Sequence, residues 1–437
     1  MLSDPIVALA TPPGRSAVAL LRLSGRGAFA IAERCLSPWR DDPPRTVFRA
    51  RLATPAGVPV DDVLAALFPG PNSYTGEDLV EISTHGGLLA PAEALAALVA
   101  AGARPAEPGE FTRRAVLNGK MDLLQAEATA DLIDASAPAQ RRRALAQLDQ
   151  SLSKRLDALR SEILELEGLT AYEIDFPEED DGPVAPERVM KTWEGVRARV
   201  AALLGTAAEG ERLREGALLV IAGPPNAGKS TLFNALLGSE RAIVTEIPGT
   251  TRDAIEAPAV IAGYPFRLVD TAGLRDAQDR IEKMGIEMSR RYLEAADVVL
   301  YCDERGQEAK GLSTTAPIVA LRTKADLGPL ASSPLGVSAV TGFGMKELKA
   351  RLAEVAFSKL IALGDVEPVV TRARHRQALE TALKELDLFK ESRESGVEAV
   401  AAATHLRAAT GALDSLIGAV TPDHVLDRVF SSFCVGK

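Results

Sequence analysis

The sequence contains little cysteine and little histidine, and this scarcity excludes two kinds of site. Only three of the 437 residues are cysteine, and Cys35, Cys302 and Cys434 stand far apart. This spacing supports neither a disulfide framework nor a CxxC zinc site. It fits a reducing compartment, so we expect a cytoplasmic protein. The four histidines show no paired-ligand spacing, which argues against a zinc centre.

A secretory leader, a membrane span and a positive net charge are also missing. The first fifteen residues lack a basic head followed by an apolar core, and the apolar stretch 88–103 is short and contains Glu93. We therefore expect no signal peptide and no membrane association, and we interpret 88–103 as an alanine-rich helix. The 50 basic and 60 acidic residues give a net charge of -10. This is the wrong sign for gripping nucleic acid unaided, so an RNA contact would need a local patch or a basic partner.

The chain does have enough apolar residues for several cores. Hydrophobic residues make up 46% of it, and its length predicts a globular protein of roughly three domains. Strand-like runs broken by turn clusters predict an α+β domain over 1–119. Apolar residues recur at helical spacing over 120–213, and a pattern typical of helices returns over 358–437. The helical series in the first of these stretches comprises Leu152, Leu156, Leu159, Ile163 and Leu166.

Between the two helical stretches, short apolar runs alternate with helical segments over 214–357. This alternation is typical of a parallel sheet. The runs span 217–222, 266–270, 297–302 and 317–322. We hypothesise that the two helical stretches pack together as one discontinuous domain, with the α/β domain inserted between them.

A phosphate-binding loop is the clearest single motif. Gly223-Pro-Pro-Asn-Ala-Gly-Lys-Ser230 matches G-x-x-x-x-G-K-[ST] between an apolar run and a helix-like run. The glycines let backbone N–H groups surround phosphate oxygens, Lys229 neutralises the outer phosphates, and Ser230 can ligate Mg²⁺. The predicted nucleotide-binding residues of this loop are Asn226, Ala227, Gly228, Lys229, Ser230 and Thr231.

Further elements follow in a fixed order. Asp270-Thr-Ala-Gly273 closes an apolar run, where a Mg²⁺-linked carboxylate and a γ-phosphate-sensing glycine belong. Together with Pro248–Thr251, Thr323–Asp326 and Ser338–Ala339, these elements resemble the G domain of Ras-like GTPases. In that family the Asp of the element that matches Thr323–Asp326 pairs with guanine, so the resemblance implies that Asp326 binds GTP rather than ATP. Thr323 stands where Asn is usual in the family. The predicted nucleotide-binding set downstream of the loop is Thr245, Glu246, Ile247, Pro248, Gly249, Thr250, Thr251, Asp270, Thr271, Ala272, Gly273, Thr323, Lys324, Asp326, Ser338 and Ala339.

The group that activates the attacking water is less obvious. Ras-like enzymes use a glutamine just after the DxxG element, but Leu274 occupies that position. Of the nearest downstream carboxylates, Glu282 could be presented by a helix that begins near Arg280. No arginine finger can be assigned, and a monovalent cation could substitute for its charge. Oxygen ligands for that cation are offered by Asn226, Thr245, Ile247 and Thr250; alternatively, Asn226 only braces the loop.

Motifs spread from the first residues to the last carry a more specific resemblance. They are Thr11–Arg15, Asn72–Asp78, His85–Gly87, Gly109–Arg113, Asn118–Asp122 with Gln125–Glu127, Gly223–Ser230, Gly249–Asp253 and Phe433–Lys437. Together they resemble the tRNA-modification GTPase MnmE (TrmE) family. The fold implied is a multidomain α/β protein, with an α+β folate-binding and dimerisation domain, a discontinuous helical domain and an inserted Ras-like P-loop G domain.

The resemblance also implies an activity and its ligands. The family is a K⁺-stimulated GTP hydrolase whose G domains meet within a homodimer. With the FAD-dependent partner MnmG (GidA), in a heterotetramer or larger complex, it adds an aminomethyl or carboxymethylaminomethyl group at C5 of wobble uridine, position 34, in certain tRNAs. The carbon donor is 5,10-methylene- or 5-formyl-tetrahydrofolate. The residues implied are Ser230 and Thr251 for Mg²⁺, Asn226, Thr245, Ile247 and Thr250 for K⁺, Glu282 for catalysis, and Arg22, Glu81, Lys120 and Lys437 for folate.

Alternatives to this function and to two local interpretations remain open. The protein could be a GTP-controlled dimeric switch, for instance in ribosome assembly, without modification chemistry; binding of a reduced folate would distinguish the two. The basic run Arg141–Arg143 could contact tRNA or form an ordinary solvated face. Cys434 is four residues from the end, but Gly436 is not aliphatic, so we place this thiol at the folate site rather than expect lipidation.

Overall fold

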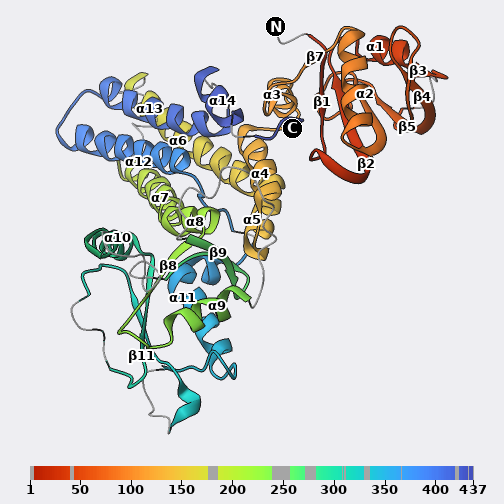
Figure 1. The fold of residues 1–437 in the computed structure, drawn as a ribbon. Helices are drawn as coiled ribbons and strands as arrows, with labels where there is room; N and C mark the ends of the chain where they lie inside the picture. Colours follow the sequence, from red (N-terminus) through yellow and green to blue (C-terminus); the bar gives the residue numbers. More distant parts are fainter. Residues whose placement is uncertain are drawn as a thin grey trace. The chain divides into compact units, whose positions relative to one another are not determined.

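The computed structural model describes residues 4–39, 44–175, 186–238, 256–270, 282–307, 309, 312–328, 335–365, 367–418, 423–431 and 433–436. Within helices, it does not describe the side chains of 173–175, 186, 282–286, 423–425 and 428. The described residues form two compact units, one from 1–130 with 417–437 and the other from 131–416 (Figure 1). The domain boundaries predicted near 119, 213 and 357 stay predictions.

The first unit is built on a seven-stranded sheet in the order β3-β4-β5-β6-β2-β1-β7. Neighbouring strands are antiparallel except for β1 and β7. Helices α1 (Ala28–Cys35) and α2 (Leu89–Ala100) share an apolar core with one face of the sheet. The strands are β1 (Ile6–Leu9), β2 (Gly14–Ser24), β3 (Leu36–Ser37), β4 (Val47–Ala53), β5 (Pro59–Phe68), β6 (Leu79–Gly87) and β7 (Arg104–Pro105).

Helices from both ends of the chain complete this unit. Helix α3 (Glu110–Leu117) follows the sheet, α4 (Leu123–Asp134) begins next, and α14 (Asp423–Phe430) returns from the C-terminal end. A small core joins Leu123 and Ala126 of α4 to Leu426, Phe430 and Phe433. The last described residues therefore lie in the same unit as the first ones.

Helices from both sides of the predicted insertion pack together in the second unit. Helix α6 (Ser151–Asp175) buries all five residues of the predicted apolar series, each at most 1% exposed. Trp193 of α7 (Pro186–Leu204) donates from Nε1 to the carbonyl of Leu386 in α12 (Ala373–Glu394) at 2.7 Å. Arg160 of α6 pairs with Asp414 of α13 (Ala399–Ile417) at 2.6 Å. The predicted pairing of the two helical stretches is confirmed.

The inserted domain is a six-stranded sheet in the order β13-β12-β11-β8-β10-β9. All neighbours are parallel except β9, which pairs with β10 as an antiparallel edge strand. The four predicted apolar runs coincide with β8, β10, β11 and β12 to within two residues; β9 and β13 are not among those runs. The strands are β8 (Ala217–Ala222), β9 (Glu256–Ile261), β10 (Tyr264–Asp270), β11 (Val298–Asp303), β12 (Ile318–Arg322) and β13 (Leu335–Gly336).

Three helices follow strands of this sheet. Helix α9 (Lys229–Gly238) follows β8, α10 (Glu282–Ala295) lies between β10 and β11, and α11 (Met345–Leu363) follows β13, with a short 3-10 turn at Ala325–Leu327 after β12. Helices α5 (Pro138–Leu148) and α8 (Ala207–Glu215) lie against β10. Among the helices that the structure describes, none has the length and apolar character needed to cross a membrane. The predicted fold class is confirmed.

Candidate nucleotide-binding site

The phosphate loop is shaped by residues with left-handed backbone. Strand β8 is buried along its whole length and ends at Ala222, and the next residue, Gly223, has a φ of +144°. A Cβ at Gly223 would collide with the carbonyl oxygen of Cys302 on β11, so only glycine fits there. Asn226 and Gly228 also have positive φ, 62° and 80°. These turns bring the chain directly into α9, whose N-terminal N–H groups attract anions.

Lys229 is the charged side chain of this loop. It is 7% exposed. Its Nζ donates to the carbonyl oxygens of Gly223 at 3.1 Å and Pro224 at 2.7 Å. The ammonium group is thus held inside the curve of the loop, where it can neutralise a phosphate.

Two predicted metal-site residues from separate motifs meet beside the loop. Ser230 Oγ donates to Asp270 Oδ2 at 2.7 Å. Asp270 is the last residue of β10, which runs parallel to β8 with Asp270 opposite Ile221. Hydroxyl and carboxylate oxygens are the ligands that Mg²⁺ prefers. The part of the chain that is described contains no cluster of three or more His, Cys, Asp or Glu side chains able to hold a metal. A Mg²⁺ ion held by this pair would therefore need phosphate or water oxygens as well.

Two neighbouring cavities follow the loop. The larger, about 790 Å³, is lined by Asn226, Lys229, Ser230 and other residues of the loop. The smaller, about 250 Å³, is lined by Thr323, Asp326, Ser338 and Ala339, all predicted to bind the nucleotide. Gly228, Thr231 and Lys324 line both cavities. The structure therefore brings the phosphate loop, Thr323–Asp326 and Ser338–Ala339 together in one continuous site.

Lys324, which lines both cavities, has a left-handed backbone conformation. Its φ is +55°, and its Nζ pairs with Glu304 Oε2 at 2.8 Å. The hydrogen bond from Lys324 lowers the pKa of the Glu304 carboxyl. Glu304 was not predicted, because a lone acidic residue after a strand gives no distinctive signal.

Asp303 is a second residue that sequence reasoning missed. It ends β11 and is 7% exposed. Its Oδ1 accepts the N–H groups of Arg305 at 2.7 Å and Gln307 at 3.1 Å, and its carbonyl accepts the N–H of Thr323 at 3.1 Å. Asp303 thus fixes the loop after β11 and the start of the base-binding element. An acidic residue closing a buried strand was the available signal.

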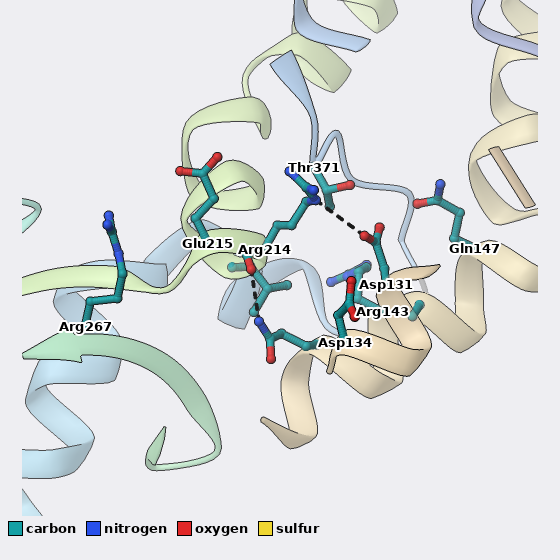
Figure 2. Close-up of a pocket in the computed structure, with 11 residues that line it drawn as sticks. Asp131, Asp134, Arg143, Gln147, Arg214, Glu215, Arg267 and Thr371 are labelled. Carbon is teal, nitrogen blue, oxygen red and sulfur yellow. Dashed lines mark hydrogen bonds and ion pairs between the residues drawn. The ribbon is translucent and has the colours of Figure 1, made fainter. Parts of the chain in front are cut away.

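Another cavity, about 400 Å³ in volume, lies between the helices and the six-stranded sheet. Figure 2 shows residues that line it. It shares no lining residue with the two cavities beside the phosphate loop.

The wall of this cavity includes Arg143, which is 7% exposed and donates to the carbonyls of Gly364 at 2.8 Å and Glu367. Burial lowers the pKa of Arg143. Arg142 pairs with Asp365 at 2.8 Å. The hypothesis of a tRNA contact is therefore wrong for Arg143, which is buried and anchors the segment after α11.

Three of the four predicted folate residues lie near the loop 69–78 of the first unit, between β5 and β6. Arg22 Nε donates to Glu81 Oε1 at 2.9 Å, and its guanidinium carbon lies 5.3 Å from the ring centroid of Tyr74. Lys120 Nζ donates to the carbonyl of Pro71 at 2.9 Å. Arg22 Nη1 is buried and has no hydrogen-bond partner among the described residues. A spare donor beside an aromatic face fits a ring-containing polar ligand.

Several predicted residues lie outside the described part of the chain. Glu282 is the first residue of α10, close to the predicted start at Arg280, but its side chain is not described. Of the four predicted K⁺ ligands, only Asn226 is described. The residues outside the description are Thr245, Glu246, Ile247, Pro248, Gly249, Thr250, Thr251, Thr271, Ala272, Gly273 and Lys437.

Comparison with known proteins covers the whole chain. The family model described as "GTP-binding protein TrmE N-terminus" matches residues 5–120, and "MnmE helical domain" matches 123–434. A protein of Salinibacter ruber is 42% identical over 461 residues, which cover 100% of this chain and 99% of the relative. Relatives from Aquifex aeolicus and Methylobacterium radiotolerans are 40% and 43% identical, each over 100% of this chain and at least 99% of their own. All three are named "tRNA modification GTPase MnmE". Their likeness extends from the sheet of the first unit through the phosphate loop to the last helix, and the chain belongs to the MnmE family of tRNA modification GTPases.

Proposed function

We propose that this GTPase is stimulated by K⁺ and acts with an FAD-dependent partner on certain tRNAs in the cytoplasm. In that reaction it installs an aminomethyl or carboxymethylaminomethyl group at C5 of wobble uridine, with a reduced folate as carbon donor. The observation that carries the nucleotide part is the meeting of Ser230 and Asp270 beside the buried Lys229. Family membership supports the tRNA part.

Different residues of the site bind different parts of GTP. Lys229 and the N–H groups at the start of α9 bind the phosphates, and Asp326 in the smaller cavity selects guanine. Ser230, Asp270 and Thr251 would hold a Mg²⁺ ion, which supplies neutralisation of the charge at the phosphates. Burial of Lys229 strengthens its attraction for the phosphates because the surroundings are less polar than water.

Water activation and K⁺ binding are proposed together. Leu274 replaces the usual glutamine, so we assign the attacking water to Glu282 at the start of α10. Asn226 lines the phosphate cavity, where its side-chain oxygen would be one K⁺ ligand. Thr245, Ile247 and Thr250 would provide the others. A cation there would stabilise the transition state in place of an arginine finger.

The folate proposal rests on Arg22, Glu81, Lys120 and Lys437. A reduced folate carries an acidic tail that suits Arg or Lys and a pterin edge that suits a carboxylate. The unpartnered Nη1 of Arg22 and the adjacent Tyr74 ring support this assignment.

Exposed apolar side chains on the sheet of the first unit support the proposal of a homodimer. Val18, Val47 and Leu64 are 62%, 60% and 50% exposed, and strand register places them on the face away from α1 and α2. Exposed apolar side chains of this kind favour association. A second copy of this chain is the occupant that we propose for that face.

The proposal is tested by nucleotide turnover and by tRNA analysis. Lys229→Ala should strongly weaken nucleotide binding, whereas Glu282→Ala should bind GTP but not hydrolyse it. Replacing K⁺ by Na⁺ should slow hydrolysis by the wild type. Nucleosides from cells lacking this chain should lack the wobble-uridine modification. Normal modification in those cells would contradict the proposed pathway, and unchanged turnover in Glu282→Ala would contradict the catalytic assignment.

A further inference from the structure

Thr323 occupies the position of the missing asparagine, and its side chain has a specific partner. Its Oγ1 donates to the carbonyl oxygen of Ala227 at 2.7 Å. Both residues are buried, at 4% and 1% exposure. Ala227 belongs to the phosphate loop and is 96 residues away in the chain. This bond therefore links the base-binding element directly to the phosphate-binding element.

The donor count of threonine decides what Thr323 can offer a nucleotide. A hydroxyl has a single O–H donor, and that donor is already given to Ala227. The backbone N–H of Thr323 is given to the carbonyl of Asp303. The remaining lone pairs of the hydroxyl are acceptors. The N7 and O6 edge of guanine also presents only acceptors, so Thr323 has nothing to pair with it.

We propose that Thr323 is a positioning residue that holds the phosphate loop through Ala227 and makes no hydrogen bond to the base. An asparagine at the same position would have two amide donors, one for Ala227 and one for the guanine edge. In this protein, guanine selection consequently falls on Asp326 and on the Ser338–Ala339 element. This inference rests on the proposed guanine-nucleotide site. It adds which residues of that site select the base and which one positions the phosphate loop.

The test compares GDP with 7-deaza-GDP, which lacks the N7 acceptor, on the full-length protein. Thr323→Val removes the hydroxyl at nearly constant shape, and the affinity for both nucleotides should fall by the same factor, about two- to tenfold for one hydrogen bond. Thr323→Ser keeps the donor and should restore both affinities to wild-type values. Thr323→Asn should gain affinity for GDP relative to 7-deaza-GDP.

A matched control separates local positioning from general loss of stability. Thr170 of α6 is buried, and its Oγ1 donates to the carbonyl of Leu166 at 2.8 Å. Thr170→Val removes a similar bond in the helical part and should leave both nucleotide affinities unchanged. If Thr323→Val weakened GDP binding but spared 7-deaza-GDP, the hydroxyl would touch the base and the proposal would be overturned. Unchanged affinity for both nucleotides would also overturn it, and a wild type that bound neither would overturn the nucleotide site itself.

Discussion

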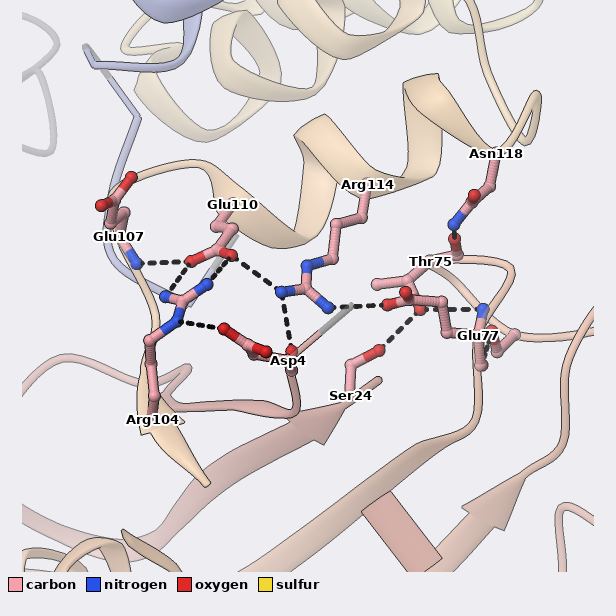
Figure 3. A network of polar contacts seen from close by, with 10 residues as sticks. Asp4, Ser24, Thr75, Glu77, Arg104, Glu107, Glu110, Arg114 and Asn118 are labelled. Carbon is pink, nitrogen blue, oxygen red and sulfur yellow. Dashed lines mark hydrogen bonds and ion pairs between the residues drawn. The ribbon is translucent and has the colours of Figure 1, made fainter. Parts of the chain in front are cut away.

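Replacing Glu110 with Gln should destabilise the first unit at neutral pH and remove part of its sensitivity to acid. Glu110 lies in the first turn of α3 (Figure 3). Its side chain is buried, with 5% of its surface exposed. It accepts hydrogen bonds from Arg104 Nη1 and Nη2 at 2.9 and 2.6 Å and from Arg114 Nη2 at 2.9 Å. The backbone N–H of Glu107 adds a fourth at 2.9 Å. Arg114 is itself 2% exposed, so this carboxylate balances a buried charge.

The size of the effect follows from the pKa of Glu110. Burial by itself would raise it, but the hydrogen bonds from Arg104, Glu107 and Arg114 outweigh burial and lower it from 4.5 to about 2. At 1.36 kcal/mol per unit, this shift corresponds to about 3 kcal/mol of stability. Because the pKa is lower in the folded state, the contribution is complete above pH 4.5 and is lost as the pH falls toward about 2.

The assay needs a probe confined to the first unit. The chain has two tryptophans, Trp39 in this unit and Trp193 in the other. In a Trp193→Phe background, the fluorescence of Trp39, whose ring lies 6.2 Å from that of Phe48, reports unfolding of the first unit alone. Urea unfolding would be measured at steps from pH 7 to pH 2.5 with and without Glu110→Gln.

The free energies of unfolding of the two proteins should differ by about 3 kcal/mol at pH 7 and by under about 1 kcal/mol at pH 2.5. Asp62→Asn is the control, because Asp62 forms exposed pairs with Arg49 and Arg51 and should change stability little at any pH. A constant difference between Glu110→Gln and the parent across the whole pH range would refute the assigned coupling. It would show that Glu110 contributes by packing and not by its charge.

Three further predictions concern the second unit. Gly223→Ala should abolish nucleotide binding in a filter-binding assay, because its methyl group meets the Cys302 carbonyl; retained binding would show that the loop can shift. Arg143→Met should lower the free energy of unfolding by about 2 to 4 kcal/mol, since two carbonyls lose their donor, while exposed Arg141→Met should change it by under about 0.5 kcal/mol. Calorimetry that gave equal values for the two variants would contradict the anchoring role. Lys229→Ala should weaken GDP binding by about 3 kcal/mol, roughly a hundredfold, in isothermal titration, and a loss under threefold would contradict phosphate binding by Lys229.

The sequence predicted four strands of the six-stranded sheet, β8, β10, β11 and β12, because each is a short and mainly apolar run, and β8 is buried along its whole length. Runs 217–222 and 266–270 coincide with β8 and with most of β10. Strand β9, which is an edge strand with a mixed burial pattern, gave no such signal. The basic run at 141–143 was ambiguous for a related reason, since charge alone does not show whether an arginine is solvated or buried against backbone carbonyls.

By itself, the sequence determined the phosphate loop, because strand, glycine turn and helix start are consecutive residues whose geometry is local. It also predicted the family, through motifs spread along the whole chain. Only the tertiary structure decided which distant groups meet. The parallel register of β8 and β10 brings Asp270 to Ser230, and the loop after β12 brings the Thr323 hydroxyl to Ala227. Antiparallel pairing of β2 with β6 likewise sets Arg22 opposite Glu81. These contacts depend on the order and register of the strands. Order and register are set by how the whole sheet buries its apolar face, so the residues adjacent in sequence to each side chain do not reveal them.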